Sequence, residues 1–227
     1  MRSRASWLFN TILLCTVSSA AQNALAASTT LEYKGFAYGS TSGTIYADLN
    51  PAKYGLESKS TVAGGFNMIE KSTDTSLIAW CVDVFHALNN KFEYTIGNSS
   101  QLNRADDLQK LVNQRYAEVT DKKTSTAFQL AIWEIVTDTG GGYSLANGTF
   151  QASGFGNAQA LASNWLKLDG KTSGNYKINY FYDGIMNDKT IAQNLISISS
   201  VPLPGAAILM LSALGLGGLL HRRRRIA

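Results

Sequence analysis

Hydrophobic and polar residues alternate with a period of two within residues 30–96 and again within residues 176–198. This alternation predicts half-buried β-strands. We expect strands at residues 30–38, 43–49, 62–69, 77–85, 92–96, 176–182 and 191–198. The densest apolar run, 77–85, is expected to be a buried strand with Cys81 at its centre. Gly64 and Gly65, inside the third expected strand, indicate a bulge or close packing.

The hydrophobic period becomes helical between residues 102 and 165. It predicts one helix over 102–119, a second that ends near residue 136, and a third over 157–165. Candidate N-caps are Ser99 or Ser100, Thr124 or Ser125, and Asn157. Residues 148–156 are expected to form a Gly-rich loop. Strands, then helices, then strands predict an α+β fold, a β-sandwich or β-barrel with a helical insertion of about three helices.

The N-terminal segment has the pattern of an export signal. Arg2 and Arg4 precede an apolar run over residues 7–17, and Ala24-Leu25-Ala26 supplies small residues at the cleavage positions. We therefore expect residues 1–26 to be a Sec-type signal peptide that signal peptidase removes after Ala26, with Ala27 as the alternative. Cys15, one of the two cysteines of the chain, leaves with it.

The C-terminal segment combines a proline motif, a short apolar run and a basic tail. Val201-Pro202-Leu203-Pro204 is followed by an apolar run over 206–220, near the lower limit for a transmembrane helix, and by four arginines at 222–225. The arginines are expected to stay cytoplasmic.

This pattern over residues 201–227 resembles the PEP-CTERM sorting signal of Gram-negative bacteria in its Val-Pro-Leu-Pro form, with Leu203 where the namesake motif has glutamate. The resemblance implies that an exosortase-type enzyme reads Val201, Pro202, Leu203 and Pro204 and removes the tail. The protein would be anchored transiently in the inner membrane by its C-terminal helix. It would then reach the cell surface or an extracellular exopolysaccharide matrix. A plain C-terminal membrane anchor is the alternative interpretation.

The charge of the chain belongs mostly to these end segments. The sequence has 20 Lys and Arg against 16 Asp and Glu, a formal net charge of +4. Without Arg2, Arg4 and the four C-terminal arginines, 14 basic residues remain and the net charge is −2. No basic patch interleaved with aromatic residues remains in the middle of the chain, so we do not expect nucleic-acid binding.

Cys81 is the only cysteine left after export, and exported proteins normally hold cysteines in pairs. Four interpretations are open: an inert buried thiol, an intermolecular disulfide, a catalytic nucleophile with His86, or an internal thioester with a glutamine. Five residues along a strand would place His86 on the opposite face from Cys81, which disfavours the third. No cluster of Cys and His, and no calcium-loop spacing of acids, predicts a metal site, so no cofactor is expected.

Gln129 is the natural partner for a thioester because it stands among apolar residues near the expected start of the second helix. An amide buried without partners costs a few kcal/mol, so this position calls for hydrogen bonds or a covalent role. A thioester also needs a dry environment, for which Trp80, Phe128 and Trp133 are the expected shields. Gln129 facing solvent or bonding to a loop is the other possibility.

Two motifs resemble those of bacterial surface thioester domains. Phe128-Gln129-Leu130-Ala131-Ile132-Trp133 is similar to their Thr-Gln-x-Ala-Ile-Trp motif, with Phe128 in place of Thr. Trp80-Cys81-Val82-Asp83 resembles the segment that supplies their cysteine. The resemblance covers roughly residues 64–165. It implies a Cys81–Gln129 thioester that a nucleophile on a target attacks once, so we do not expect an enzyme. Asp83 and Glu134, beside the two motifs, are candidates to assist proton transfer, although such carboxylates are also common as structural hydrogen-bonding groups.

Together these observations predict a signal peptide (1–26), a thioester-like surface domain (27–200) and a sorting signal with a transmembrane helix (201–227). The expected function is adhesion at the cell surface or in the matrix, by covalent bonding to a protein amine or a sugar hydroxyl of a surface polymer. The alternative is a non-covalent structural or carbohydrate-binding domain in which Cys81 is inert.

Overall fold

The computed structural model describes residues 27–48, 55–88, 91–168, 176–186 and 190–201. The expected signal peptide, the C-terminal helix and its arginines, and Pro202, Leu203 and Pro204 of the sorting motif lie outside the described residues, which reach Val201. Among the described residues, no helix has the length and apolar character needed to cross a membrane.

Six antiparallel strands close into a barrel in the order β10-β5-β4-β1-β6-β8, and β8 pairs with β10 to complete it. A short strand, β9, extends the sheet beyond β8. The bounds are Ser28–Phe36 (β1), Phe66–Glu70 (β4), Thr75–Cys81 (β5), Lys91–Asn98 (β6), Tyr176–Met186 (β8), Thr190–Ile191 (β9) and Leu195–Ser200 (β10). Closure joins the two edges of the sheet, so the six strands pair without a free edge.

The barrel interior is filled by the apolar residues of the alternating pattern. Residues directly opposite one another on paired strands point to the same face, so the pairs Leu31–Phe92, Leu195–Phe181 and Cys81–Leu195 face one side together. All of these side chains are buried. Cys81 therefore belongs to the inward-facing set, at the end of its strand.

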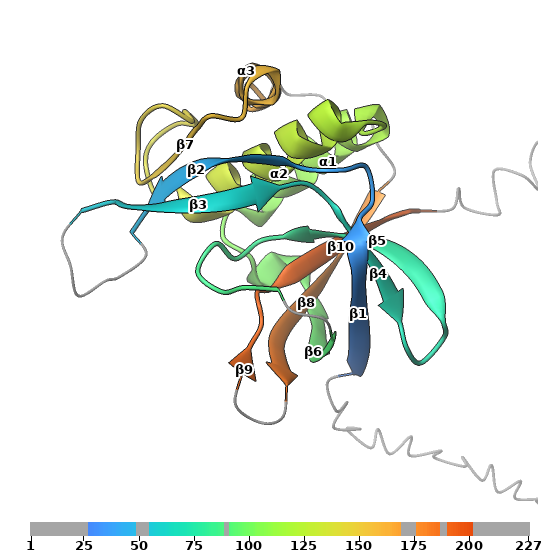
Figure 1. Cartoon of the computed structure of the whole chain (residues 1–227). Helices are drawn as coiled ribbons and strands as arrows, with labels where there is room; N and C mark the ends of the chain where they lie inside the picture. The colour runs from blue at the N-terminus through green and yellow to red at the C-terminus, as the bar shows by residue number, and fades with distance from the viewer. Residues whose placement is uncertain (1–26, 49–54, 89–90, 169–175, 187–189, 202–227) are drawn as a thin grey trace, which may run out of the picture.

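A second layer covers one end of the barrel (Figure 1). It contains the three-stranded sheet β3-β2-β7 together with the helices. The strands are Thr41–Ala47 (β2), Glu57–Ala63 (β3) and Phe150–Ser153 (β7). The α-helices are Ala105–Arg115 (α1), Lys122–Thr137 (α2) and Asn157–Trp165 (α3), and Ser99–Gln101 (η1) and Tyr116–Glu118 (η2) are 3₁₀-helices. The α+β prediction with three helices is confirmed, and of its two alternatives the barrel is the one observed.

Helix α2 lies at the centre of the molecule. Every residue from Ser125 to Ile135 is buried, as expected for a helix that packs on all sides. It contacts α1 and α3, the second sheet, and strand β5 of the barrel. A side chain from α2 can therefore reach the barrel strand that carries Cys81.

The expected strand 62–69 is wrong as a single element. Strand β3 ends at Ala63 and β4 begins at Phe66, and the two belong to different sheets. Gly64 and Gly65 connect the two strands at a point where no side chain fits. A Cβ on Gly64 would lie 2.7 Å from the carbonyl oxygen of Gly39, and a Cβ on Gly65 would lie 2.7 Å from the Trp80 ring. Periodicity within the segment did not reveal this change of sheet.

The expected Gly-rich loop over 148–156 contains strand β7, which pairs with β2 and buries Phe150 and Ala152. Asp121, rather than Thr124 or Ser125, caps α2; its carboxylate accepts the Thr124 amide at 2.8 Å.

Two other capping predictions are also wrong. Asn98 caps η1, while α1 begins after Arg104 without a side-chain cap. Asn157 is the first residue of α3 and follows Gly156, which has a φ of +58°.

Candidate site at Cys81 and Gln129

The peptide groups of Cys81 lie where strand β5 loses one of its two neighbours. On one side Cys81 is opposite Leu195 of β10, and the bond from Val82 N to Asn194 O joins the next residues. In an antiparallel ladder, hydrogen-bonded and non-hydrogen-bonded pairs alternate, so the N–H and C=O of Cys81 point away from β10. They point toward β4, whose pairing with β5 stops at Phe66 and Ala79.

The side chain of Gln129 occupies this position. Its Oε1 accepts the N–H of Cys81 at 3.0 Å, and its Nε2 donates to the Cys81 carbonyl at 2.7 Å. Gln129 is 1% exposed, and the interaction takes the place of a neighbouring strand. Because one carboxamide bonds both backbone groups of Cys81, its carbonyl carbon is held beside the residue that carries the thiol.

The thiol is buried in the barrel and held by the chain that follows it. Cys81 Sγ donates to the carbonyl of Asp83 at 3.0 Å, and the Asp83 amide donates to Sγ at 3.3 Å. Burial raises the pKa of the Cys81 thiol to about 12, although the nearby Trp133 side chain and hydrogen bonding from the Asp83 backbone oppose the increase. The thiol is therefore protonated at neutral pH. This disfavours spontaneous oxidation, which follows thiolate character and exposure.

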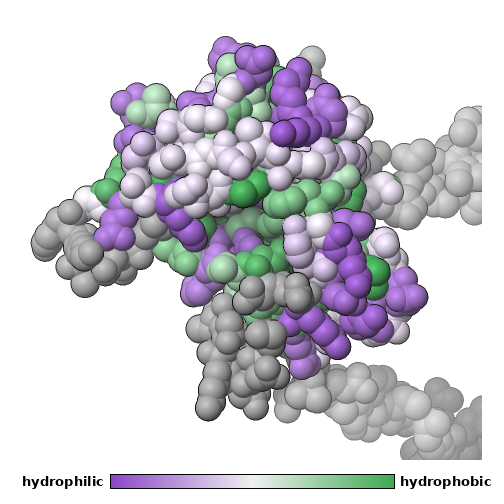
Figure 2. Space-filling model, viewed as in Figure 1, coloured by the Kyte–Doolittle hydropathy of each residue, from purple (hydrophilic) through white to green (hydrophobic). Residues whose placement is uncertain are grey.

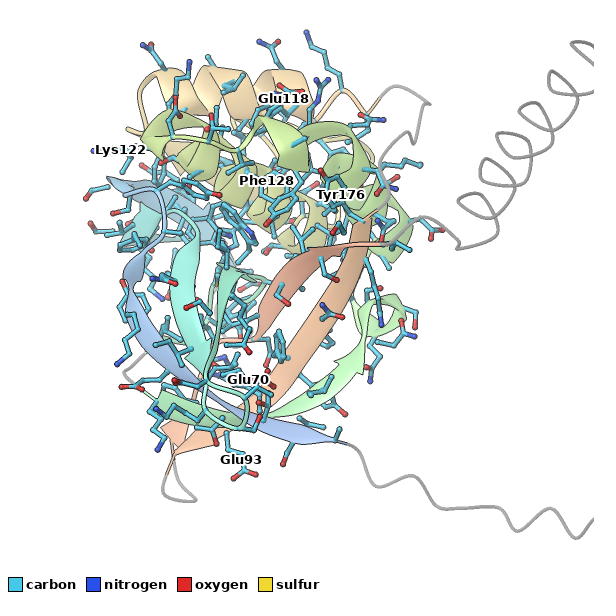
Figure 3. The ribbon with its side chains drawn as sticks, turned by 90° about the vertical axis from the view of Figure 1, so that its right-hand side faces the viewer. Glu70, Glu93, Glu118, Lys122, Phe128 and Tyr176 are labelled. Carbon is cyan, nitrogen blue, oxygen red and sulfur yellow. The ribbon has the colours of Figure 1, made fainter. Side chains whose placement is uncertain are left out.

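Aromatic rings enclose the pair. Trp80 and Phe128 meet edge to face with ring centroids 4.9 Å apart, and Phe128 also contacts Tyr116 and Trp165. Figure 3 shows Phe128 between the helical layer and the barrel. The two rings flank Cys81 and Gln129 in the sequence and are fully buried, so they exclude water from this side of the pair.

A cavity of about 300 Å³ reaches Cys81 from the other side. Its lining includes Cys81, Asp83, His86, Lys59 and Trp133. Figure 2 shows hydrophobic surface along the hollow between the second layer and the barrel.

Trp133 contributes an unusual donor to this cavity. It lies one helical turn after Gln129 on α2, on the same face. Its buried indole N–H has no acceptor at hydrogen-bonding geometry among the described residues, although the indole lies close enough to the thiol to lower its pKa. Buried indole N–H groups normally find a partner, and on the wall of this cavity the Trp133 N–H is placed to donate to a charge that develops there.

Asp83 organises the turn that follows the strand. Its Oδ1 accepts the amides of Phe85 and His86 at 2.9 and 3.3 Å, and its Oδ2 is 2.7 Å from Nδ1 of His86. The expectation that His86 lies on the far face of the strand is wrong because β5 ends at Cys81, not at 85. The turn brings His86 back to the cavity that Cys81 lines.

Glu134 has a different environment from the other predicted site residues. Five positions after Gln129, it is turned about 140° around the helix axis. Its Oε1 accepts the amide of Ser144 at 2.6 Å, which anchors the loop after α2. Burial raises the pKa of Glu134 to about 7, partly opposed by the Ser144 hydrogen bond.

The structure thus brings together Cys81, Gln129, Trp80, Asp83, Phe128 and Trp133, and directs the Glu134 carboxylate to a loop. It adds two residues that the sequence did not select, His86 and Lys59. The spacing Asp83-x-x-His86 after a strand was the available signal for the first. No local signal marked Lys59, which comes from β3.

No family model matches the chain, and no curated protein matches it. Among solved structures, the chain is similar to the N-terminal thioester domain of a protein F2-like fibronectin-binding protein from Streptococcus pneumoniae. The identity is 12%, the TM-score is 0.41, and the alignment covers 74% of this chain and 99% of that one.

Proposed function

We propose that this protein is an exported surface or matrix adhesin that bonds covalently to its target through an internal thioester between Cys81 and Gln129. The observation that carries the proposal is the pair of hydrogen bonds between the Gln129 carboxamide and the Cys81 backbone, at a buried position that a cavity reaches. It holds the electrophilic carbon of Gln129 beside the residue that carries the thiol, so the reacting groups belong to neighbouring residues of one fold.

The condensation balances without any further reactant. Cys81 Sγ attacks Cδ of Gln129, the thiol proton passes to Nε2, and the bond from Cδ to Nε2 breaks to release ammonia. A thioester between Sγ and Cδ remains. Before condensation, Nε2 of Gln129 donates to the Cys81 carbonyl at 2.7 Å, and this hydrogen bond is lost when ammonia leaves.

The surroundings favour both formation and survival of the bond. The tetrahedral intermediate carries negative charge on Oε1, where the Cys81 N–H already donates. The unpaired indole N–H of Trp133 is a second donor on the cavity wall. Donors held in place for such an oxygen are a strong source of rate enhancement. Trp80 and Phe128 keep water from the opposite side.

Capture of a target uses the cavity. An amine or hydroxyl attacks Cδ of Gln129, the bond from Cδ to Sγ breaks, and the proton of the nucleophile passes to Sγ. The product is an amide or ester cross-link and a free Cys81 thiol. Each molecule reacts once, so this is bonding rather than turnover. Export by the Sec pathway, removal of the signal peptide by signal peptidase and processing at residues 201–204 by an exosortase-type enzyme would deliver the domain to the cell surface or matrix.

The deciding experiment is the intact mass of the exported protein, purified without reductant and without amine buffers. We expect a mass one ammonia below that of the processed sequence, and the full sequence mass for Cys81→Ala. Methylamine should add to Gln129 of the folded protein and expose one titratable thiol. A wild-type mass equal to the plain sequence, with one thiol detected after unfolding, would refute the proposal.

A non-covalent carbohydrate-binding domain is the second candidate function. A groove of about 720 Å³ favours it, since it is lined by carboxylate, amide and hydroxyl side chains beside aromatic ones, including Glu70, Asn67, Asn179, Tyr116 and Phe181. Figure 3 shows Glu70 at the end of the barrel away from Phe128, and Cys81 is not among the residues that line this groove. Glycan binding that is unchanged in Cys81→Ala would support this candidate.

A further inference from the structure

The turn after strand β5 places a paired histidine and carboxylate at the cavity that reaches Cys81. Asp83 is 9% exposed and accepts two backbone amides, so its position is fixed. Its other oxygen is 2.7 Å from Nδ1 of His86. A carboxylate accepts hydrogen bonds, so this pairing assigns a hydrogen to Nδ1 and, in the neutral ring, leaves Nε2 as the acceptor nitrogen.

The same turn also holds the thiol. The Asp83 backbone donates to and accepts from Cys81 Sγ, while its side chain fixes the turn and orients His86. One residue therefore couples the position of the sulfur to that of the imidazole. Cys81, Asp83 and His86 all line the 300 Å³ cavity, through which a nucleophile would arrive.

We infer that His86, oriented by Asp83, is the general base of this site, and that its target is a hydroxyl group of a polyol or carbohydrate rather than an amine. The inference rests on the proposed thioester. A neutral amine attacks a thioester without help, whereas a hydroxyl is a weak nucleophile that must lose its proton as the new bond forms. A histidine held in one tautomer by a carboxylate supplies that function in hydrolases that activate a serine hydroxyl.

Lys59 supports the choice of nucleophile by its charge. It lines the same cavity from β3, and its Nζ donates to the Val84 carbonyl at 3.1 Å. Its proximity to Cys81 is sufficient to oppose the increase in the thiol pKa. A lysine side chain of a target protein arrives protonated at neutral pH, and a fixed positive charge in the cavity repels it. A neutral sugar hydroxyl meets no such barrier.

The transfer balances through His86 alone. The hydroxyl oxygen bonds to Cδ of Gln129 while its proton moves to Nε2 of His86. The bond from Cδ to Sγ breaks, and the protonated imidazole returns the proton to the sulfur. The products are an ester on Gln129, a neutral Cys81 thiol and His86 in its original state.

The test compares two nucleophiles on the exported protein, with adduct formation followed by intact mass. Wild type, His86→Gln and Asp83→Asn are first checked for the loss of ammonia, and each is then treated with glycerol or with methylamine. We expect His86→Gln to lower the rate of the glycerol adduct by about 10²-fold or more. Its methylamine rate, measured at the same pH, should stay within about threefold of wild type, because the unprotonated fraction of the amine is the same for both proteins and attacks without a base. Asp83→Asn should lower the glycerol rate in the same direction.

Phe85→Ser is the matched control, since it changes an exposed side chain of the same turn and keeps the amide that Asp83 binds. Its two rates should equal those of wild type. Equal losses with both nucleophiles in His86→Gln, or no loss with glycerol, would overturn the role of His86 while leaving the thioester intact. A wild-type protein that never loses ammonia would overturn the proposed function and this inference together, and the mass measurement separates that failure from the others.

Discussion

The amide of Gln129 is expected to stabilise the fold even where no thioester can form. In a Cys81→Ala background, Gln129→Leu keeps a side chain of similar size and removes both hydrogen bonds to the residue 81 backbone. The N–H and C=O of residue 81 are then buried without partners, since β4 does not extend alongside them. The double variant should therefore be less stable than Cys81→Ala alone.

The magnitude follows from those two groups. A buried backbone group left unpaired costs roughly 1–3 kcal/mol, so two cost about 2–6 kcal/mol. Burying an apolar side chain at this 1%-exposed position returns about 1.5–2 kcal/mol. The net loss in the free energy of unfolding is then about 0–4.5 kcal/mol, with a central value of about 2 kcal/mol, a large part of the total stability of an ordinary domain.

Urea unfolding followed by tryptophan fluorescence measures this difference. Gln159→Leu, in the same Cys81→Ala background, is the control because it makes the same substitution on a partly buried position of α3. We expect it to change stability by less than about 0.5 kcal/mol. A Gln129→Leu effect no larger than that of the control would show that the amide does not replace a strand at Cys81, and the geometric basis for the site would fail.

Three further predictions concern other residues. Trp133→Phe keeps an aromatic ring but removes the indole N–H, so methylamine incorporation should slow by about 10²-fold in protein that is still folded; an unchanged rate would exclude the indole as a donor to the intermediate. Burial raises the pKa of Glu134 from 4.5 to about 7, so the folded state binds this proton more tightly than the unfolded state does. The protonated carboxyl therefore stabilises the folded state fully below pH 4.5, and this stabilisation is lost as the pH rises through 7. In Glu134→Gln, the free energy of unfolding should depend less on pH between 4.5 and 7. A pH dependence equal to that of wild type would contradict the raised pKa of Glu134. Asp121→Ala removes the cap of α2 and should cost about 1 kcal/mol in urea unfolding, whereas Asp121→Asn should cost less.

Several errors in the sequence-based prediction have one cause. Residues 62–69 and 77–85 each read as one strand because their side chains are apolar, yet the chain leaves the strand at Ala63 in the first and at Cys81 in the second. Each strand end lies beside a partner that is distant in sequence. The Trp80 ring packs against Gly65 after the first strand, and the Gln129 amide bonds to Cys81 at the end of the second. A local pattern reports which side chains prefer burial, but it does not report which neighbour satisfies the backbone.

His86 illustrates the consequence for the site. Extending the strand to residue 85 placed this histidine on the wrong face and removed it from consideration. The actual turn depends on Asp83 accepting two backbone amides, which the sequence Asp-x-Phe-His permits without requiring. Glu134 shows the converse, since its closeness to the Gln129 motif in sequence suggested a shared site, but the helical twist turns it toward Ser144.

The sequence alone determined the types of the main elements, the α+β class and the buried character of Cys81 and Gln129, because the spacing of apolar residues fixes which faces must be covered. It also supplied the hypothesis that these two residues meet. Only the tertiary structure decided that the strands close into a barrel, that β5 stops at Cys81 and that His86 and Lys59 reach its cavity. The pairing of strands and the points where strands end depend on hydrogen bonds and contacts between residues far apart in the chain. The local spacing of apolar residues therefore does not predict them.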